Sequence, residues 1–414
     1  MKWGENIMNI SVLIWGTGDT GKHIVSKSLG DARVKIIGFG DDDKSLVGKN
    51  FCDLPIYDIE TLKNNIKDID CVIIARNSSE QLYKTIFDEL SVPVFRSYKL
   101  FCFYCLNMRC SIDISGWCNA RCKYCYTGRN NIMNCHHDAK YMKYDEFVKA
   151  YTHLTRTGIM HNFNEVMLYS WGDPFLNPDY LKIIEYLNEN NQKYAISTNA
   201  SNPQMINAGD AYKSCSIAIF SLSGFSKESY SRIHGFDIDI IKKNITNLIS
   251  NMREHGFVGV GKISFHVYKF NEKEVYDAEA FAKSLGLEFE PVKAYLASWS
   301  MKKQFLSNQM EKEVLKEVQS ELLIENVDNI IKNRPVDYRC PLENIISINM
   351  YGDIELCCCS DEDAKDYSWE SIYKINNISE WIDYRKEMLR CDTCFECRKL
   401  GVDYWMCNGE KYKF

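Results

Sequence analysis

At 414 residues the chain is long enough for two or three domains, and a hydrophobic content of 45% supports sizeable apolar cores. The net charge of −6 at pH 7 and a pI near 5.9 argue against a nucleic-acid-binding protein, which needs a basic face to neutralise phosphates. The sequence has no long apolar run and no signal-like N-terminal segment, so we expect a cytoplasmic protein without a membrane span.

The 18 cysteines are distributed unevenly, and most of them fall within residues 102–135 and 340–407. Three others are scattered in apolar segments and are expected to be ordinary buried residues: Cys52, Cys71 and Cys215. The clustering is typical of metal ligation in a reducing compartment rather than of a secreted disulfide framework.

The first hundred residues alternate short apolar runs with helical patterns. The runs predict buried strands at residues 9–15, 34–39, 71–75 and 92–95. The first strand leads into a G-x-G-x-x-G turn and a helix, and the second leads into an acidic residue. This order of elements is the context of a Rossmann-type nucleotide site. The candidate nucleotide-binding residues are Gly16, Gly18, Gly21 and Asp41.

This region resembles the nucleotide- or sugar-nucleotide-binding domains of bacterial surface-polysaccharide enzymes. The likeness lies in Ile-Gly-Phe-Gly-Asp-Asp-Asp at 37–43 and Asp-Leu-Pro-Ile-Tyr at 53–57. It implies a doubly wound, Rossmann-like domain over residues 1–98 that binds a nucleotide or sugar nucleotide. A Rossmann scaffold with an empty site is the alternative. No catalytic partner for hydride transfer is visible nearby, so the sequence does not indicate an NAD dehydrogenase.

From Cys110 to about Trp299 the chain repeats strand and helix in about six units. The expected strands are residues 110–115, 165–170, 193–198, 217–222, 262–268 and 288–292. Such a repeat predicts a parallel sheet curled into a partial (β/α)6 barrel, with a site at the carboxyl ends of the strands.

Three thiols lie within eight residues directly after the first strand of this repeat, in Cys-Asn-Ala-Arg-Cys-Lys-Tyr-Cys at 118–125. A disulfide would leave one thiol over, and a structural zinc site usually takes four ligands, of which no fourth lies at a short spacing. A cubane iron–sulfur cluster held by three thiolates would keep one iron open for another ligand. A cysteine-rich turn that binds zinc or nothing is the alternative.

This Cys-x3-Cys-x2-Cys spacing, with an aromatic residue before the third cysteine, resembles the signature loop of radical S-adenosylmethionine (SAM) enzymes. The resemblance implies that Cys118, Cys122 and Cys125 ligate a [4Fe–4S] cluster and that Tyr124 belongs to the SAM site. The open iron would bind the amino and carboxylate groups of SAM. One electron, from a reductant such as flavodoxin or ferredoxin, would then cleave the sulfonium and release a 5′-deoxyadenosyl radical.

Two further motifs fall at strand ends. Ser-Trp-Gly-Asp-Pro at 170–174 resembles the Gly-Gly-Glu-Pro motif of the same family, with an aspartate in place of the usual glutamate. Ser-Thr-Asn at 197–199 ends the next strand, where family members place polar contacts to SAM. An ordinary Gly-Asp-Pro turn is the alternative for the first motif. The resemblance adds to the SAM site Trp171, Gly172, Asp173, Ser197 and Asn199.

Residues 309–333 combine charges with apolar residues at helical intervals, which predicts an amphipathic connecting helix whose charges face solvent. We therefore expect a partial barrel over residues 99–305, a linking helix over 306–334 and a small iron–sulfur domain over 335–414.

The last segment opens like the SPASM domain, which carries auxiliary iron–sulfur clusters, because Cys340 is followed by Gly352 and Cys357 at the matching spacing. It then departs from the two-cluster pattern, which suggests one auxiliary [4Fe–4S] cluster, as in the shorter "twitch" variants. A Cys-x2-Cys pair would complete the ligands. We prefer Cys394 with Cys397 and keep Cys391 in reserve. Zinc held by four thiolates is the alternative.

The combined prediction is an enzyme that cleaves SAM and abstracts a substrate hydrogen. The expected substrate is a sugar, sugar nucleotide or related metabolite of surface-polysaccharide biosynthesis, which would be oxidised or epimerised. A peptide-modifying maturase is the alternative. A non-catalytic iron–sulfur electron carrier or nucleotide sensor is an alternative of another class, but it would have no need for an open iron.

Overall fold

The protein is described by a computed structural model, which covers residues 10–29, 31, 34–65, 69–76, 80–90, 92–102, 109–134, 140–157, 159, 165–324, 327–336, 338–357, 360 and 370–408. The chain divides into two compact units. The first comprises residues 1–108 together with 153–163 and 375–384, and the second comprises the remainder.

The N-terminal unit contains a six-stranded sheet in the order β3-β4-β2-β1-β5-β6. Its elements are β1 (Ile10–Trp15), α1 (Asp19–Ser28), β2 (Val34–Gly40), β3 (Asn50–Phe51), β4 (Leu54–Tyr57), α2 (Ile59–Asn65), β5 (Cys71–Ile74), α3 (Glu80–Leu90), β6 (Val94–Phe95) and α4 (Tyr98–Phe101). The central strand β1 pairs in parallel with β2 and β5, and its apolar residues form a core with the side chains of β5 and α3. The antiparallel β3–β4 pair makes the sheet mixed. The expected α/β class is confirmed, and the Rossmann assignment stays a prediction.

The second unit contains an eight-stranded sheet in the order β12-β11-β10-β9-β8-β7-β13-β14. The strands are β7 (Arg109–Ile112), β8 (Val166–Met167), β9 (Tyr194–Thr198), β10 (Cys215–Leu222), β11 (Val260–Val267), β12 (Glu288–Lys293), β13 (Ile345–Ile348) and β14 (Ile354–Glu355). Strands β7 to β12 are parallel and follow one another in chain order, which confirms the predicted partial barrel.

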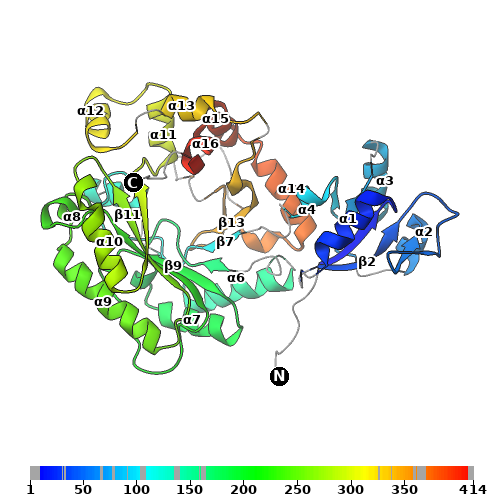
Figure 1. Ribbon diagram of the computed structural model, residues 1–414, viewed down its shortest axis with the longest axis horizontal. Helices are drawn as coiled ribbons and strands as arrows, with labels where there is room; N and C mark the ends of the chain where they lie inside the picture. Colours follow the sequence, from blue (N-terminus) through cyan, green and yellow to red (C-terminus); the bar gives the residue numbers. More distant parts are fainter. Residues whose placement is uncertain are drawn as a thin grey trace. The chain divides into compact units, whose positions relative to one another are not determined.

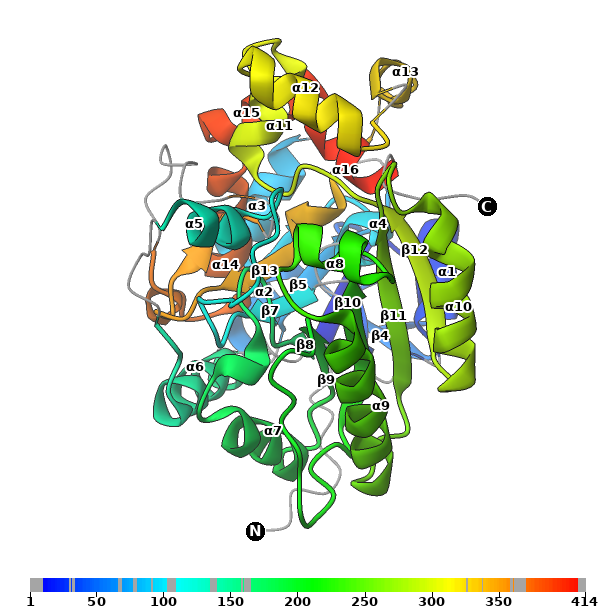
Figure 2. The ribbon, with the colours of Figure 1, turned by 90° about the vertical axis from the view of Figure 1, so that its left-hand side faces the viewer.

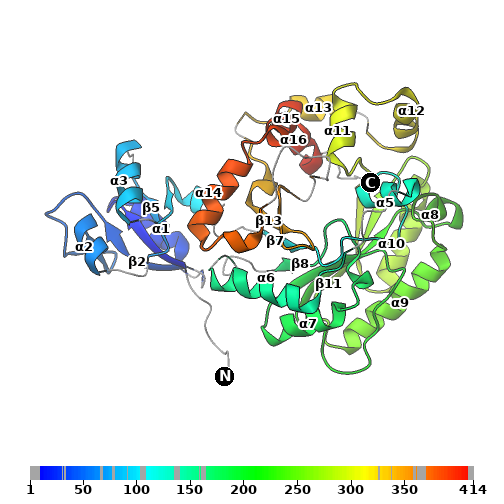
Figure 3. The same ribbon diagram turned by 180° about the vertical axis from the view of Figure 1, so that it is seen from behind.

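Helices cover one face of this sheet, as Figures 1 and 3 show for α7 (Tyr180–Glu189), α9 (Ile238–Glu254) and α10 (Val275–Ser284). Helix α9 begins with a side-chain cap, because the side chain of Asp237 accepts the backbone N–H of Asp239. The remaining helices before the C-terminal segment are α5 (Tyr126–Met133), α6 (Tyr144–Arg156) and α8 (Lys227–Ile233).

The C-terminal segment extends the barrel sheet. Strand β13 pairs in parallel with β7, so that Ile346 lies opposite Cys110, and β14 pairs antiparallel with β13. The segment therefore adds two strands beyond the six of the barrel. The proposed domain limits stay predictions.

The expected single helix over residues 309–333 is wrong, because it consists of α12 (Lys312–Glu321) and α13 (Val327–Lys332). Leu322 ends α12 in an extended conformation with φ −96° and ψ 147°. The expectation that its charges face solvent fails at Glu321, which is only 2% exposed. Figure 2 shows these helices gathered at one end of the unit with α11 (Trp299–Leu306), α15 (Asp392–Leu400) and α16 (Val402–Asn408).

A core of apolar side chains lies beneath these helices and includes Tyr124 of the cluster loop, Val318 and Leu322 at the end of α12, and Trp405 of α16. Helix α14 (Ile378–Met388) precedes α15 in the chain. None of the helices in the ranges described above is long and apolar enough to cross a membrane.

Candidate active site

The cluster loop, residues 118–125, runs between β7 and α5, at the carboxyl end of the barrel strand as predicted. Asn131 of α5 folds back onto it and donates hydrogen bonds to the carbonyls of Cys118 at 2.6 Å and Ala120 at 2.7 Å. Gly128 packs so closely against the loop that a Cβ there would lie 2.3 Å from the carbonyl oxygen of Cys122. Helix α5 therefore shapes the loop directly.

The three thiols of the loop lie close enough to influence one another. Burial raises the pKa of Cys118, Cys122 and Cys125, and the neighbouring thiols raise it further for the first two. N–H donors also point at the sulfur atoms, including the Asn199 amide at 3.4 Å from Cys118 Sγ. Half-buried thiols with such donors suit thiolates whose charge a bound cluster neutralises.

Within the described ranges, no three Cys, His, Asp or Glu side chains converge as ligands of a single metal ion. A cubane cluster does not require that convergence, because each thiolate binds a different iron. The donor set of the loop therefore fits a [4Fe–4S] cluster.

Asp173 connects the Gly-Asp-Pro turn to the next strand. Its carboxylate is 4% exposed and accepts hydrogen bonds from Thr198 Oγ1 at 3.0 Å, Asn199 N at 2.9 Å and Phe175 N at 3.0 Å. Its own N–H donates to the carbonyl of Trp117, one residue before the cluster loop. Burial raises the pKa of Asp173, and these hydrogen bonds oppose the rise.

The turn also lies against the segment between β7 and the cluster loop. A Cβ on Gly172 would lie 1.4 Å from the carbonyl oxygen of Ser115, so only glycine allows this approach. The buried Asp113 accepts the backbone N–H groups of Trp171 at 3.0 Å and Ser115 at 3.2 Å. Burial raises the pKa of Asp113 to about 6, while these N–H bonds lower it. Asp113 was not among the predicted site residues, although a charged residue within the apolar run at 110–115 is a visible signal in the sequence.

The structure therefore brings most of the predicted SAM residues to the cluster loop. Trp171 is joined to α5 through its carbonyl, which accepts the Thr127 hydroxyl at 2.9 Å. Ser197 lies on β9 and is partly exposed. The Tyr124 ring is buried, and its hydroxyl donates to Glu321 at 2.8 Å. Contact of these residues with SAM stays a prediction.

Two polar groups that the sequence analysis missed lie near the thiols. Among the described residues, Tyr230 Oη and His234 Nδ1 are buried without a hydrogen-bond partner. Their rings stack at 4.6 Å, and His234 Nε2 pairs with Ser223 Oγ at 2.8 Å. Burial, followed by the thiols of Cys122 and Cys118, raises the pKa of Tyr230. Unpartnered buried groups next to a ligand site are candidates to contact the ligand.

The structure brings three of the proposed auxiliary cysteines together. The thiols of Cys391 and Cys357 both raise the pKa of Cys394, the first through a hydrogen bond. Cys397 packs against the apolar cluster of Trp299 and Val402. This placement brings the reserve ligand, Cys391, next to Cys394.

Arg385, which the sequence analysis missed, holds this region together. It is 1% exposed and donates to the carbonyls of Leu342 at 2.6 Å, Glu343 at 3.0 Å and Leu356. Leu342 and Leu356 lie two residues after Cys340 and one before Cys357, so Arg385 fixes the backbone next to both cysteines.

In the N-terminal unit, Gly16 and Gly18 lie between β1 and α1, and Gly21 lies within α1. Asp41 follows β2, and its carboxylate accepts the N–H and the hydroxyl of Thr17 at 3.2 and 2.8 Å. Burial raises the pKa of Asp41, but hydrogen bonds from Asp43 and Thr17 outweigh it, so that the pKa lies below its usual value. The carboxylate is thus engaged with the glycine turn. Nucleotide binding at these residues stays a prediction.

Two family profiles match parts of this chain. The profile of the Radical SAM superfamily matches residues 112–282, and the profile "C2185-like, N-terminal" matches residues 8–96. A search of curated proteins found no match.

Solved structures similar to this chain include SuiB of Streptococcus suis bound to its precursor peptide SuiA, with 14% identity over 90% of this chain and 83% of SuiB and a TM-score of 0.48. They also include anSMEcpe with bound AdoMet, with 15% identity over 70% of this chain and 82% of that one and a TM-score of 0.40. BtrN in complex with AdoMet and 2-DOIA has 14% identity over 72% of this chain and 87% of that one, with a TM-score of 0.32.

Proposed function

Because this chain is an enzyme of the radical SAM superfamily, we propose that it reductively cleaves SAM with a [4Fe–4S] cluster held by Cys118, Cys122 and Cys125. The bound cluster would supply one electron that splits SAM into methionine and a 5′-deoxyadenosyl radical, which takes a hydrogen atom from the substrate to give 5′-deoxyadenosine. The observation that carries this proposal is the half-buried set of three thiols in the loop at the carboxyl end of β7.

The surrounding residues prepare the site before SAM binds. Asn199 donates to the Cys118 thiol, and Asp173 fixes the backbone of Asn199. Gly172 allows the turn at 170–174 to lie against the start of the cluster loop. We propose that the amides and side chains of Trp171, Gly172, Asp173, Ser197 and Asn199 orient SAM and exclude water from the radical.

The test is anaerobic incubation of the reconstituted protein with SAM and dithionite. 5′-Deoxyadenosine should form with dithionite and should be absent without it. Failure to form any of this product would contradict the proposed function.

We propose two classes of substrate for this enzyme. A sugar or sugar nucleotide follows from the resemblance of the N-terminal region, which we propose binds a nucleotide at Gly16, Gly18, Gly21 and Asp41. A peptide is the alternative, and a precursor peptide is bound in the similar structure of SuiB. Stimulation of 5′-deoxyadenosine formation by UDP-sugars or by synthetic peptides separates the classes. A flavodoxin or ferredoxin as reductant and a cytoplasmic location also stay predictions.

Tyr230→Phe should separate ligand contact from folding. The substitution removes a buried hydroxyl that has no partner in the described part of the chain, so the melting temperature should stay the same or rise. If this hydroxyl contacts SAM or substrate, formation of 5′-deoxyadenosine should fall about three- to tenfold, the equivalent of one hydrogen bond.

Tyr194→Phe is the matched control. Tyr194 Oη donates to the carbonyl of Ala211 at 3.1 Å, and the residue lies at the start of β9, away from the carboxyl edge. This variant should melt at a lower temperature and keep its rate. Equal rates in both variants would contradict a ligand contact at Tyr230.

For the C-terminal segment we propose one auxiliary [4Fe–4S] cluster, with Cys340, Cys357, Cys391 and Cys394 as ligands. Reconstituted protein should then contain about eight irons per chain. Cys391→Ala should lose about four of them, whereas Cys397→Ala should keep all. The reverse result would restore Cys397 as the ligand, and zinc in place of iron would remove the auxiliary cluster.

A further inference from the structure

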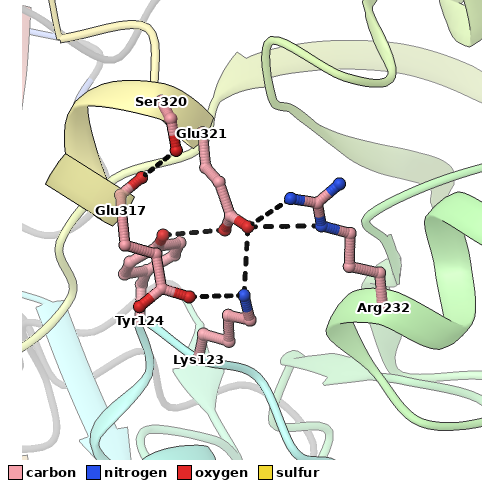
Figure 4. Close-up of polar contacts among 6 residues, drawn as sticks. All are labelled: Lys123, Tyr124, Arg232, Glu317, Ser320 and Glu321. Carbon is pink, nitrogen blue, oxygen red and sulfur yellow. Dashed lines mark hydrogen bonds and ion pairs between the residues drawn. The ribbon is translucent and has the colours of Figure 1, made fainter. Parts of the chain in front are cut away.

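A buried carboxylate on α12 contacts the cluster loop. Glu321 Oε2 accepts the hydroxyl of Tyr124 at 2.8 Å, and Oε1 accepts Lys123 Nζ at 3.0 Å. Oε1 also accepts Arg232 of α8, at 3.2 Å from Nε and 2.6 Å from Nη2. Figure 4 shows the three donors converging on this one side chain. Lys123 and Tyr124 are the two residues between Cys122 and Cys125. Glu321 therefore contacts the loop between two of the proposed cluster ligands.

The burial of Glu321 sets it apart from its neighbour on the same helix. The side chain of Glu321 is 3% exposed, whereas that of Glu317 is 50% exposed. Burial raises the pKa of Glu321, but the hydrogen bonds from Tyr124, Arg232 and Lys123 outweigh it, and the pKa lies below its usual value. Glu317 touches the loop only through Lys123 Nζ, at 2.7 Å, among its described contacts. Glu317 and Glu321 thus lie on one helix and both contact Lys123 Nζ, but the described hydrogen bond to Tyr124 is made by Glu321.

The backbone of Glu321 and the residues near it also make contacts that fix its position. Its carbonyl accepts the backbone N–H of Lys269, just after β11, at 2.9 Å. Val318 and Leu322, on either side of it, belong to the same apolar core as Tyr124 and Tyr268. The Tyr124 carbonyl in turn accepts the N–H of Ala297 at 2.9 Å. Tyr124 is therefore fixed at its hydroxyl, its ring and its backbone by segments that surround the loop.

We propose that Glu321 is a positioning residue for the SAM cluster. Through its hydrogen bond to Tyr124, Glu321 holds residues Cys122–Cys125 of the loop in the conformation that the cluster needs to bind SAM. Glu321 lies beyond residues 112–282, the part of the chain that matches the superfamily profile. The conformation of the cluster loop would thus depend on a helix outside that part. Residues that orient metal ligands from a distance commonly change metal affinity or activity 10- to 100-fold when removed.

The experiment uses the full-length reconstituted protein and follows the EPR spectrum of the reduced cluster as SAM is added. The unsubstituted protein is measured first. If SAM does not change the EPR spectrum of this protein, that result would contradict the proposed function rather than this inference. If SAM changes the spectrum, Glu321→Gln and Tyr124→Phe should each need about tenfold more SAM for half of the change. Glu317→Gln removes one negative charge from the same helix and should need the same SAM concentration as the unsubstituted protein.

The Tyr124→Phe variant keeps the buried ring and leaves no charge unpaired. Its EPR response to SAM can therefore still be measured if Glu321→Gln fails to fold or to hold iron. The double variant Glu321→Gln/Tyr124→Phe should need no more SAM than Glu321→Gln alone, because both substitutions remove the same hydrogen bond. A normal SAM response in Tyr124→Phe, or an equal loss in Glu317→Gln and Glu321→Gln, would overturn the proposal. The second outcome would show that charge alone matters.

Discussion

Replacing Cys122 with alanine is expected to abolish the SAM-dependent formation of 5′-deoxyadenosine, a loss of at least about a hundredfold. Cys122 is the middle of the three proposed ligands, and its thiol interacts with both others. With two thiolates left, the cluster would lose one of its three anchors and the iron content should fall by about four per chain. The product is measured by chromatography and the iron by metal analysis.

Cys110→Ala is the matched control for this substitution. Cys110 is fully buried on β7, a few residues before the cluster loop, and is an ordinary core residue in the fold. The variant should lose some stability but keep its iron and its product. An unchanged yield of 5′-deoxyadenosine in Cys122→Ala would contradict the assigned chemistry.

Asp173→Ala should have the second-largest effect. The substitution leaves Thr198 Oγ1, Asn199 N and Phe175 N without their buried acceptor, and each unsatisfied group costs about 1–3 kcal/mol. We therefore expect the free energy of unfolding to fall by about 3 kcal/mol or more, and SAM binding to be lost with the geometry of the turn. Thermal unfolding and the EPR response to SAM measure the two effects.

Glu185→Ala controls for the removal of an acidic side chain, since Glu185 is exposed on α7. This variant should match the unsubstituted protein in both measurements. If Asp173→Ala unfolds at the same temperature as Glu185→Ala and still responds to SAM, the role given to Asp173 is wrong.

Strands β1, β2, β5 and β6 and the barrel strands β7 to β12 could be predicted because they are short apolar runs separated by helical patterns. The hairpin of β3 and β4 gave no such signal. Its turn is made by Cys52 and Asp53, both at positive φ of 51° and 60°, where Asn-Gly or Asp-Gly is the usual indication. The strands themselves are two and four residues long, and one contains Pro55.

The residues of the candidate site that lie in motifs could be named from the sequence, whereas those that join it only through distant contacts could not. Glu321 lies in a charged segment that fits a solvated helix, and its partners Arg232 and Tyr124 are 89 and 197 positions away. Arg385 and the pairing of β13 with β7 are equally non-local. The spacing of Cys391, Cys394 and Cys397 left two pairs open, because it does not reveal that α15 packs Cys397 against an apolar cluster.

The most direct measurement is the EPR spectrum of the freshly reduced, reconstituted protein before and after addition of SAM. If three thiolates leave one iron open, SAM should bind there and change the spectrum. A spectrum that stays the same at saturating SAM would mean that no iron is open to it, and the proposed cleavage would then have no site.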